Sequence, residues 1–353
     1  MPVVRAPGRV NLIGDHTDYQ DGFCLPMAID REVVVRCAPR ADGLVVARSD
    51  ALAGIVEIPA DGSADPRRVE PRWGRSVAAV LRLLARPDRP ALGFDAEVTS
   101  TVPVGSGLSS SAAFAVAMVI AAGEIRGSAA EPESVAQTAQ AAEQAATGVP
   151  CGVMDQMASV FGRAGHALLL DCRSLDIEPV LLPRSVTVVV VHTGIARRLE
   201  DSAYAERRAA CEAAAARLGV VTLRETTLDQ VATDPFARHV VSENQRVLDF
   251  VDALRTGDLD CCGRLMAASH ASLRDDFRVS TPELDALVEA LVRAGAYGAR
   301  LTGAGFGGCA VGLIANAAVD DALAAAVGSY RSATGLTPIP LVVRAVDGAG
   351  LVE

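Results

Sequence analysis

Charged and hydrogen-bonding side chains crowd into a short stretch near the N-terminus, residues 5–29. It reads RAPGRVNLIGDHTDYQDGFCLPMAI, and turn-forming glycines interrupt it at positions 8, 14 and 22. Short carboxylates beside an Arg and a His can each accept from or donate to a hydroxyl group in a fixed direction. The stretch is therefore typical of a loop that binds a polyhydroxylated ligand, although its composition fits a solvated surface loop equally well.

A loop rich in glycine and serine, residues 103–113, precedes an apolar helical pattern. It reads PVGSGLSSSAA. A flexible loop followed by a helix start directs several backbone N–H groups and the positive end of the helix dipole at one spot. This arrangement predicts an anion site whose hydroxyls can reach a metal or a phosphate oxygen. Alternatively, the serines could serve only as N-cap residues of the helix.

Three further features carry polar groups in unusual places. Asp155 falls in the first turn of a short apolar helix within GVPCGVMDQMASVFG, and Glu143 is a lone acid in AAEQAA. Electrostatic stabilisation at a helix start would be enough to explain Asp155. Glu143 could simply be a solvated surface residue. Four glycines in LTGAGFGGCAVGL, residues 301–313, indicate a close backbone approach to a ligand or to another segment. A smaller motif, YAERR at 204–208, opens a helix.

The composition excludes several chemistries. All 33 basic residues are Arg, which removes a Lys-dependent Walker-A loop and Schiff-base catalysis. The net charge of −10 and the absence of a dense basic patch argue against nucleic-acid binding. Eight scattered cysteines without a CxxC pair are typical of reduced thiols. The first residues lack signal-peptide architecture and the longest apolar helical run, 112–123, is too short for a bilayer, so we expect a cytoplasmic protein without membrane contact.

Strand and helix patterns alternate along the chain. Helical periodicity predicts helices near 73–85, 110–124, 133–146, 203–218, 240–255, 258–273, 282–294 and 318–333. Apolar runs predict strands at 33–37, 44–47, 54–58, 94–98, 167–171, 187–191, 309–314 and 341–346. Regular helical crossovers do not separate the early strands, which favours an α+β fold over a doubly wound parallel sheet. We expect a domain boundary near 180–185, where 177–183 separates a helix-rich segment from the next strand.

Taken together, these segments resemble the galactokinases of the GHMP small-molecule kinase superfamily. The first resembles the galactokinase signature, PVGSGLSSSAA the superfamily phosphate loop, and LTGAGFGGC its third motif. The runs CGVMDQ, ALLLDCRSL and SHASLRDDFRVSTPELDALV are similar to galactokinase sequences as well. The resemblance implies two α+β domains with the active site between them. Residues 1–182 would form an N-terminal domain like ribosomal protein S5, and residues 183–353 a C-terminal α+β domain.

The resemblance also implies a reaction, the ATP-dependent phosphorylation of the anomeric hydroxyl of D-galactose to galactose 1-phosphate. Arg9 and Asp155 would flank the reacting hydroxyl. The sugar would be held by Asp15, His16, Asp18, Gly152 and Tyr204. The phosphates of ATP would be cradled by Gly105, Ser106, Gly107, Leu108, Ser109, Ser110 and Ser111. Mg²⁺ would be held by Ser111 and Glu143, and the adenine would lie near Trp73.

These roles agree with the chemistry of phosphoryl transfer, which needs positioning and charge neutralisation more than covalent help. In a lysine-free chain the neutralisation must come from Mg²⁺, Arg and backbone N–H groups. Mg²⁺ keeps several waters, so one hydroxyl and one carboxylate suffice. A helix start and a neighbouring Arg9 both weaken Asp155 as a base. We therefore expect Asp155 to orient the hydroxyl and to accept its proton late.

Two residues depart from the family pattern. Asp15 stands where the family usually has Glu, so we expect an altered or relaxed preference around the exocyclic carbon of the sugar. Ala196 stands where a basic residue is common, and the adjacent Arg197 would have to replace it. A GHMP-fold kinase for other or more sugars, and a non-catalytic sugar sensor, are the alternatives. We expect a monomer or a weak homo-oligomer.

Overall fold

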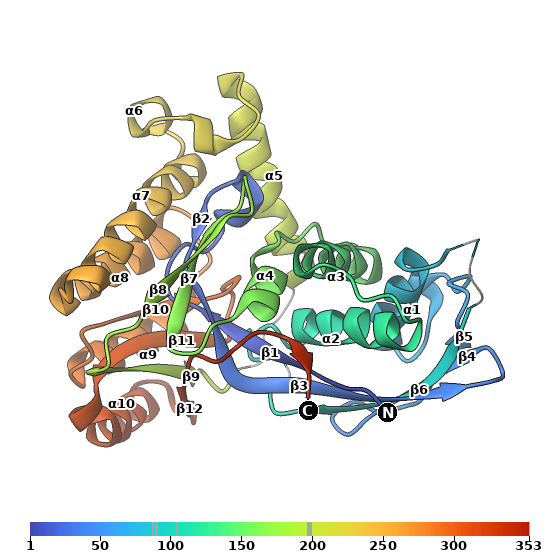
Figure 1. Ribbon diagram of the computed structural model, residues 1–353. Helices are drawn as coiled ribbons and strands as arrows, with labels where there is room; N and C mark the ends of the chain where they lie inside the picture. The colour runs from blue at the N-terminus through green and yellow to red at the C-terminus, as the bar shows by residue number, and fades with distance from the viewer. Residues whose placement is uncertain (87, 89–90, 104, 196–199, 353) are drawn as a thin grey trace.

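The structure, a computed structural model, describes residues 1–353 except 87, 89–90, 104, 196–199 and 353. Figure 1 shows the first half of the chain as a long sheet beneath helices, and the second half as a group of helices around a smaller sheet. The fold is α+β, as the sequence predicts.

The larger sheet has six strands in the order β13-β1-β3-β6-β4-β5. These are β1 (Val3–Asn11), β3 (Pro26–Arg40), β4 (Leu44–Ser49), β5 (Val56–Pro59), β6 (Gly93–Ser100) and β13 (Gly350–Leu351). All neighbours run antiparallel except β4 and β6. Because β13 pairs with β1, the last strand of the chain lies on the N-terminal sheet. The division at residue 182 stays a prediction.

Helices α1 (Gly74–Leu83), α2 (Ser110–Ile125), α3 (Pro132–Thr147) and α4 (Met154–Phe161) belong to this half. The α2 helix is apolar on all sides because it lies between β1 and β3 below and the other three helices around it. That burial fixes the position of its N-terminus, which follows the glycine- and serine-rich loop. Among the described residues, none of the helices combines the length and hydropathy needed to cross a membrane.

The second half is built on an antiparallel sheet in the order β10-β11-β9-β12. Its strands are β9 (Val186–His192), β10 (Gly298–Thr302), β11 (Cys309–Ala315) and β12 (Ile339–Val343). The helices are α5 (Glu200–Leu218), α6 (Leu228–Val231), α7 (Pro235–Thr256), α8 (Leu259–Asp275), α9 (Pro282–Arg293) and α10 (Val319–Thr334). Short 3₁₀ turns occupy Asp18–Gln20, Pro66–Arg68, Leu223–Glu225 and Asn316–Ala318.

A third, three-stranded sheet joins distant parts of the chain. It pairs β2 (Phe23–Cys24) with β7 (His166–Asp171) and β7 with β8 (Ile177–Leu181). The segment 177–183, which we expected to be only a separator, is therefore mostly strand β8.

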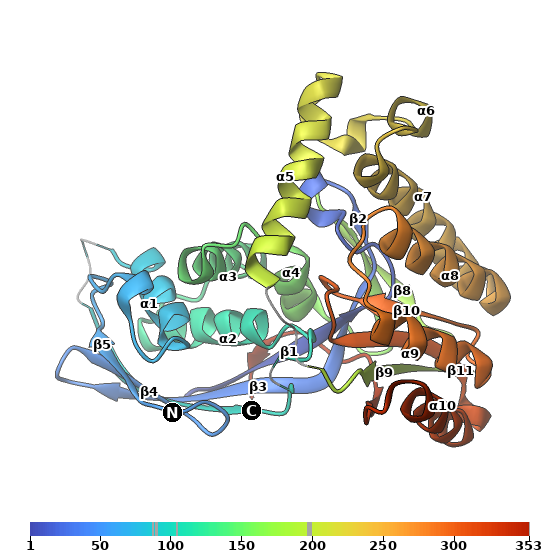
Figure 2. The same cartoon turned by 180° about the vertical axis from the view of Figure 1, so that it is seen from behind.

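One apolar cluster extends through both halves. The largest buried cluster runs from the N-terminal sheet to Val190 of β9 and Val247 and Phe250 of α7. Its continuity means that the position of one half relative to the other is set by packing. Figure 2 shows the N-terminal end of α5 beside α4, so the helices of both halves meet around one region.

Candidate active site

A cavity of about 370 Å³ lies where the two halves meet. We call residues 11–22 the polar loop and residues 105–111 the serine loop; both contribute to its walls. The sequence-predicted residues that line it are Arg9, Asp15, His16, Asp18, Gly105, Gly107, Ser109, Ser110, Ser111, Glu143, Gly152, Asp155 and Tyr204. The third glycine-rich motif contributes Gly303 and Ala304. Segments far apart in the sequence thus form one site.

Arg9 and Asp155 form the link between β1 and α4 in the wall of this cavity. The Nε and Nη2 atoms of Arg9 each lie 2.7 Å from Oδ1 of Asp155. Nη1 of Arg9 donates to the carbonyl of Gly107 at 2.7 Å, and the Ser109 hydroxyl donates to Oδ2 of Asp155. Both carboxylate oxygens accept hydrogen bonds, and the same Arg ties Asp155 to the serine loop. Asp155 keeps 28% of its side chain exposed.

The serine loop curls around the start of α2 through left-handed backbone at Gly105, Gly107 and Ser109. Ser109 occupies the N-cap position but makes no capping bond, because its hydroxyl reaches Asp155. The capping alternative therefore fails for this residue. The first N–H groups of α2, beside the lining residues Ser110 and Ser111, gain no side-chain cap. This is the geometry of an anion site.

Two predicted members of the loop hold it from behind. The Ser106 hydroxyl donates to the carbonyl of Pro103 at 2.7 Å, and the carbonyl of Leu108 accepts from the N–H of Arg9 at 3.1 Å. Both Ser106 and Leu108 are buried and lie outside the cavity lining.

Glu143 of α3 faces the same helix start. Its Oε1 accepts from the Ser111 hydroxyl and its Oε2 from Nε2 of Gln156, each at 2.6 Å. Burial, with a smaller contribution from the charge of Asp155, raises the pKa of Glu143 to about 7. A cation bound at Ser111 and Glu143 would lower this pKa, because it would favour the ionised form of Glu143.

The cavity carries more negative than positive charge. Its lining includes the carboxylates of Asp15, Asp18, Glu143 and Asp155 but, among the described residues, Arg9 as the one Arg. Burial, followed by the charge of Asp155, raises the pKa of Asp18 to about 6. An anion would enter this site most readily together with a cation.

The donor set fits Mg²⁺. A hydroxyl and a carboxylate are hard oxygen ligands, and Mg²⁺ commonly takes few protein ligands while keeping waters. Within the described ranges, no three His, Cys, Asp or Glu residues are grouped to enclose a metal ion. The pair Ser111 and Glu143 therefore suits a metal shared with a phosphate ligand better than a closed structural metal site.

His16 lies at the base of the polar loop with both ring nitrogens engaged. Nε2 lies 3.1 Å from the carbonyl of Ala304, and Nδ1 lies 3.0 Å from the hydroxyl of Tyr19. Burial lowers the pKa of His16 to about 4, so the ring is neutral near pH 7. Because a carbonyl only accepts, the proton belongs on Nε2. A sugar contact through a ring nitrogen would have to replace one of these bonds.

Asp18, Gly152 and Tyr204 lie together on another side of the cavity. A Cβ added to Gly152 would lie 1.8 Å from Oδ2 of Asp18, so only glycine leaves room for the carboxylate. Nη1 of Arg208 donates to the carbonyl of Pro150 at 2.6 Å. This bond joins α5, which carries Tyr204, to the loop that carries Gly152.

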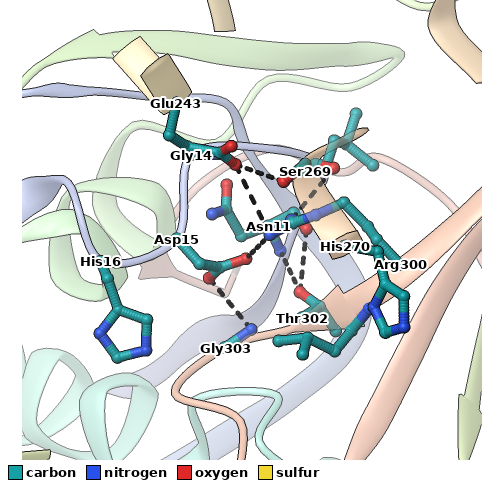
Figure 3. A network of polar contacts seen from close by, with 12 residues as sticks. Asn11, Gly14, Asp15, His16, Glu243, Ser269, His270, Arg300, Thr302 and Gly303 are labelled. Carbon is teal, nitrogen blue, oxygen red and sulfur yellow. Dashed lines mark hydrogen bonds and ion pairs between the residues drawn. The ribbon is translucent and has the colours of Figure 1, made fainter. Parts of the chain in front are cut away.

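Asp15 is held by the second half of the chain. Figure 3 shows its carboxylate beside Arg300 and the backbone of Gly303. Nη2 of Arg300 lies 2.6 Å from Oδ2 of Asp15, and the N–H of Gly303 donates to Oδ1 at 3.0 Å. Sequence reasoning missed Arg300 because nothing local marks a buried Arg as a partner of a distant loop. It also missed Gln156, although the CGVMDQ run contains it.

Trp73 lies apart from the cavity. It precedes α1, its Nε1 donates to the carbonyl of Ala53 at 3.1 Å, and its ring centroid lies 6.0 Å from that of Phe114. It is not among the lining residues, and its contact with adenine stays a prediction. Ala196 and Arg197 lie outside the described residues.

Family models match three regions of the chain. The galactokinase galactose-binding signature matches residues 2–39, and the N-terminal and C-terminal domains of GHMP kinases match residues 75–163 and 250–332. A galactokinase of Roseiflexus sp. (strain RS-1) is 45% identical, with 99% of this chain and 93% of that protein covered. This chain belongs to the galactokinase family. The human galactokinase is 42% identical, with 91% and 85% covered.

Solved structures agree with membership of the galactokinase family. The galactokinase of Lactococcus lactis, solved in complex with galactose, matches with a TM-score of 0.91 and 31% identity, covering 99% of this chain and 95% of that one. A mevalonate kinase matches with a TM-score of 0.71 at 17% identity, which shows a common fold only. The expected GHMP fold and the expected enzyme class, a galactokinase that uses ATP, are thereby confirmed.

Proposed function

We propose that this galactokinase family member transfers the terminal phosphoryl group of ATP to the anomeric hydroxyl of D-galactose at the cavity between its two halves. The observation that carries the proposal is the position of Asp155. This carboxylate is bonded to Arg9 of β1 and to Ser109 of the serine loop at once. A carboxylate that lines the same cavity as the polar loop and is bonded to the serine loop is where a hydroxyl and a phosphate would meet.

The phosphates would lie on the serine loop and the first N–H groups of α2. Mg²⁺, held by Ser111 and Glu143, would neutralise charge on the phosphate oxygens. Arg9 is the Arg in the described lining, and its guanidinium would remain close to the transferring group. These groups are fixed before the reaction, which is the main source of rate enhancement in phosphoryl transfer.

Asp155 would orient the sugar hydroxyl and receive its proton. The anomeric oxygen attacks the terminal phosphorus, the bond from phosphorus to the bridging oxygen of ADP breaks, and the hydroxyl proton passes to the carboxylate of Asp155. The hydrogen bonds from Arg9 and Ser109 to Asp155 support a late transfer. In a loose transition state the hydroxyl keeps its proton until the bond to the leaving group is largely broken.

The sugar would lie between the polar loop and the part of the cavity wall formed by Gly152 and Tyr204. Asp18 and Tyr204 offer an acceptor and a hydroxyl, and Gly152 leaves room for the Asp18 carboxylate. Asp15 and His16 are already paired with Arg300, Gly303, Ala304 and Tyr19. They would shape the wall as much as they would bond to the sugar.

A broader range of sugars is the second candidate, and Asp15 is the observation that favours it. Its carboxylate is drawn toward Arg300 and Gly303, and its side chain is 2% exposed. A short acid held in this way leaves more space at the cavity wall than a Glu would. We therefore expect tolerance of substituents at the exocyclic carbon.

A panel of free sugars with ATP and Mg²⁺ tests both candidates. We expect sugar-dependent ADP release that is fastest with galactose, and detectable rates with galactose analogues substituted at the exocyclic carbon. Equal ADP release with and without sugar would overturn the proposed function. Strict rejection of every such analogue by the wild type and by Asp15→Glu alike would remove the second candidate.

We also propose a cytoplasmic location, which agrees with cysteines that form no disulfide in the structure, and a monomeric or weakly associated state. Cell fractionation and sedimentation velocity would test them.

A further inference from the structure

Arg300 is a fully buried cation in the middle of β10, whose five residues are all buried. Its Nη2 lies 2.6 Å from Asp15 and 3.8 Å from Oε1 of Glu243, which belongs to α7. Its Nη1 donates to the carbonyl of Leu12 at 3.3 Å. Figure 3 shows Asp15 of the polar loop, Arg300 of β10 and Glu243 of α7 lying near one another.

The charges in this network balance. Two carboxylates, Asp15 and Glu243, face two guanidinium groups, Arg300 and Arg246, and Nε of Arg246 lies 2.6 Å from Oε2 of Glu243. Burial alone would raise the pKa of Glu243, but Arg246, His239 and Arg300 together lower it to about 2. Removing Arg300 alone would leave an uncompensated negative charge in the interior.

The backbone of the polar loop has other anchors. Thr302 exchanges hydrogen bonds with the N–H and the carbonyl of Asn11, at 3.1 and 2.9 Å. Glu243 accepts from the N–H of Gly14 at 3.1 Å, and Nε2 of His239 lies 3.1 Å from the carbonyl of Asp15. The loop would therefore keep its path without Arg300.

The side chain of Asp15 depends on Arg300 to a greater degree. Within the part of the chain that the structure describes, this carboxylate pairs with the N–H of Gly303 and with the Arg300 guanidinium. Asp15 also lines the cavity, whereas Arg300 and Glu243 do not. Arg300 can therefore act on a ligand in the cavity only through the position and charge of Asp15.

We propose that Arg300 is a positioning residue for sugar binding, which fixes the Asp15 carboxylate at the cavity wall and thereby sets discrimination at the sugar hydroxyl that faces it. This rests on the proposed function. The ligand class is a hexose with a hydrogen-bond donor opposite Asp15. Without Arg300 the Asp15 carboxylate would lose its orientation, and the hydrogen bond to that hydroxyl would contribute less to sugar affinity.

Two charge-balanced double variants test the proposal, Asp15→Asn with Arg300→Met and Glu243→Gln with Arg300→Met. The single variant Asp15→Asn, which removes one negative charge, is their reference. Each double variant removes one positive and one negative charge, so neither leaves an excess charge in the interior. Arg293→Met, on the exposed face of α9, is the matched control. Unfolding in urea checks that each protein is folded.

The readouts are KM and kcat with galactose, KM for MgATP, and relative kcat/KM for the monodeoxy galactoses. We expect Glu243→Gln with Arg300→Met to raise the galactose KM about tenfold, the effect of one lost charge-assisted bond. Discrimination at a single hydroxyl should collapse, while kcat and the KM for MgATP change by less than about twofold. Adding Arg300→Met to Asp15→Asn should change the galactose KM by less than about twofold, because both act through one carboxylate.

A purely structural role for Arg300 predicts a different result. The Glu243→Gln and Arg300→Met pair would then keep the galactose KM and the hydroxyl discrimination of the wild type, and that outcome would overturn the proposal. A further large rise in KM when Arg300→Met is added to Asp15→Asn would also overturn it. Galactose binding measured by calorimetry distinguishes failure of the proposed function from failure of the positioning role of Arg300. A wild type that binds galactose without phosphorylating it contradicts the proposed function alone.

Discussion

The two sides of the cavity differ in how their charges are satisfied. On the polar-loop side, Asp15 is 2% exposed and paired with Arg300, which is itself fully buried. On the serine-loop side, Glu143 is half-buried, Ser111 is exposed, and the start of α2 has no side-chain cap. On the first side the buried Asp15 carboxylate faces a cation of the protein itself, whereas the second side has an excess of acid and unused N–H donors.

We infer from this difference that the polar-loop side serves mainly to bind the sugar and the serine-loop side mainly to support the reaction. A pre-paired network holds its groups in one arrangement and binds a neutral sugar without a change in net charge. Under the proposed function, a metal ion and phosphates bound on the unbalanced side would stabilise it. Variants on the serine-loop side should therefore change catalysis and metal dependence, and variants beside the polar loop should change sugar binding.

Asp155→Asn should have the largest effect. The amide keeps the size of the side chain but cannot receive the hydroxyl proton, so we expect kcat to fall about 10²- to 10⁴-fold. ATP binding measured by calorimetry should be retained. Asp249→Asn, on the exposed surface of α7, is the control and should keep normal turnover. Substantial activity in Asp155→Asn would contradict the role of this carboxylate.

Gly152→Ala should rank second and act on the sugar side. The new Cβ would lie 1.8 Å from Oδ2 of Asp18, so the carboxylate must move. A displacement of this size is expected to lower kcat/KM for galactose about 10²-fold, with little change in the KM for MgATP. Steady-state kinetics measures both. Gly328→Ala, where the added Cβ meets no atom within 4 Å, is the control; a Gly152→Ala enzyme with normal kcat/KM would show that Asp18 does not contact the sugar.

Glu143→Gln should weaken the metal site while leaving the sugar side unchanged. We expect the Mg²⁺ concentration for half-maximal activity to rise about tenfold, because a charged ligand becomes neutral. The galactose KM should stay as in the wild type. Glu133→Gln, exposed on the same helix, is the matched control. An unchanged Mg²⁺ requirement would place the metal elsewhere.

The smallest effect should be on the pH dependence of stability. Burial raises the pKa of Glu143 from 4.5 to about 7 and that of Asp18 from 3.8 to about 6 in the folded protein. The folded state then binds more protons than the unfolded chain across this window, so these groups lower the free energy of unfolding as pH rises from about 4 to about 7. Urea unfolding without Mg²⁺ should show a shallower decline in Glu143→Gln than in the wild type. Parallel curves would contradict the raised pKa.

Much of the fold could be predicted because its signals are local. The apolar run after the serine loop predicts a helix at 110–124, and α2 spans Ser110–Ile125. The α7 helix was expected to begin at 240 but begins at Pro235, because Asp234 accepts from the N–H groups of Phe236 and Ala237. That capping signal is present in the sequence and was missed.

The rest of the site depends on long-range pairing that no local pattern reveals. Strand β10 reads GARLT, where a Gly and an Arg argue against a buried strand. It is buried because Arg300 pairs with Asp15 and Glu243, which are far away in the sequence. The residues of the motifs could be assigned to one site from the sequence. Their distant partners, such as Arg300, could not, because only the folded chain brings them together.

The most direct test of the transfer reaction is phosphorus NMR of the wild-type enzyme with ATP, Mg²⁺ and galactose. A single sugar phosphate should form in step with ADP, and its phosphorus should couple to the anomeric proton. Phosphate attached at another carbon, or inorganic phosphate as the sole product, would contradict transfer to the anomeric hydroxyl at Asp155.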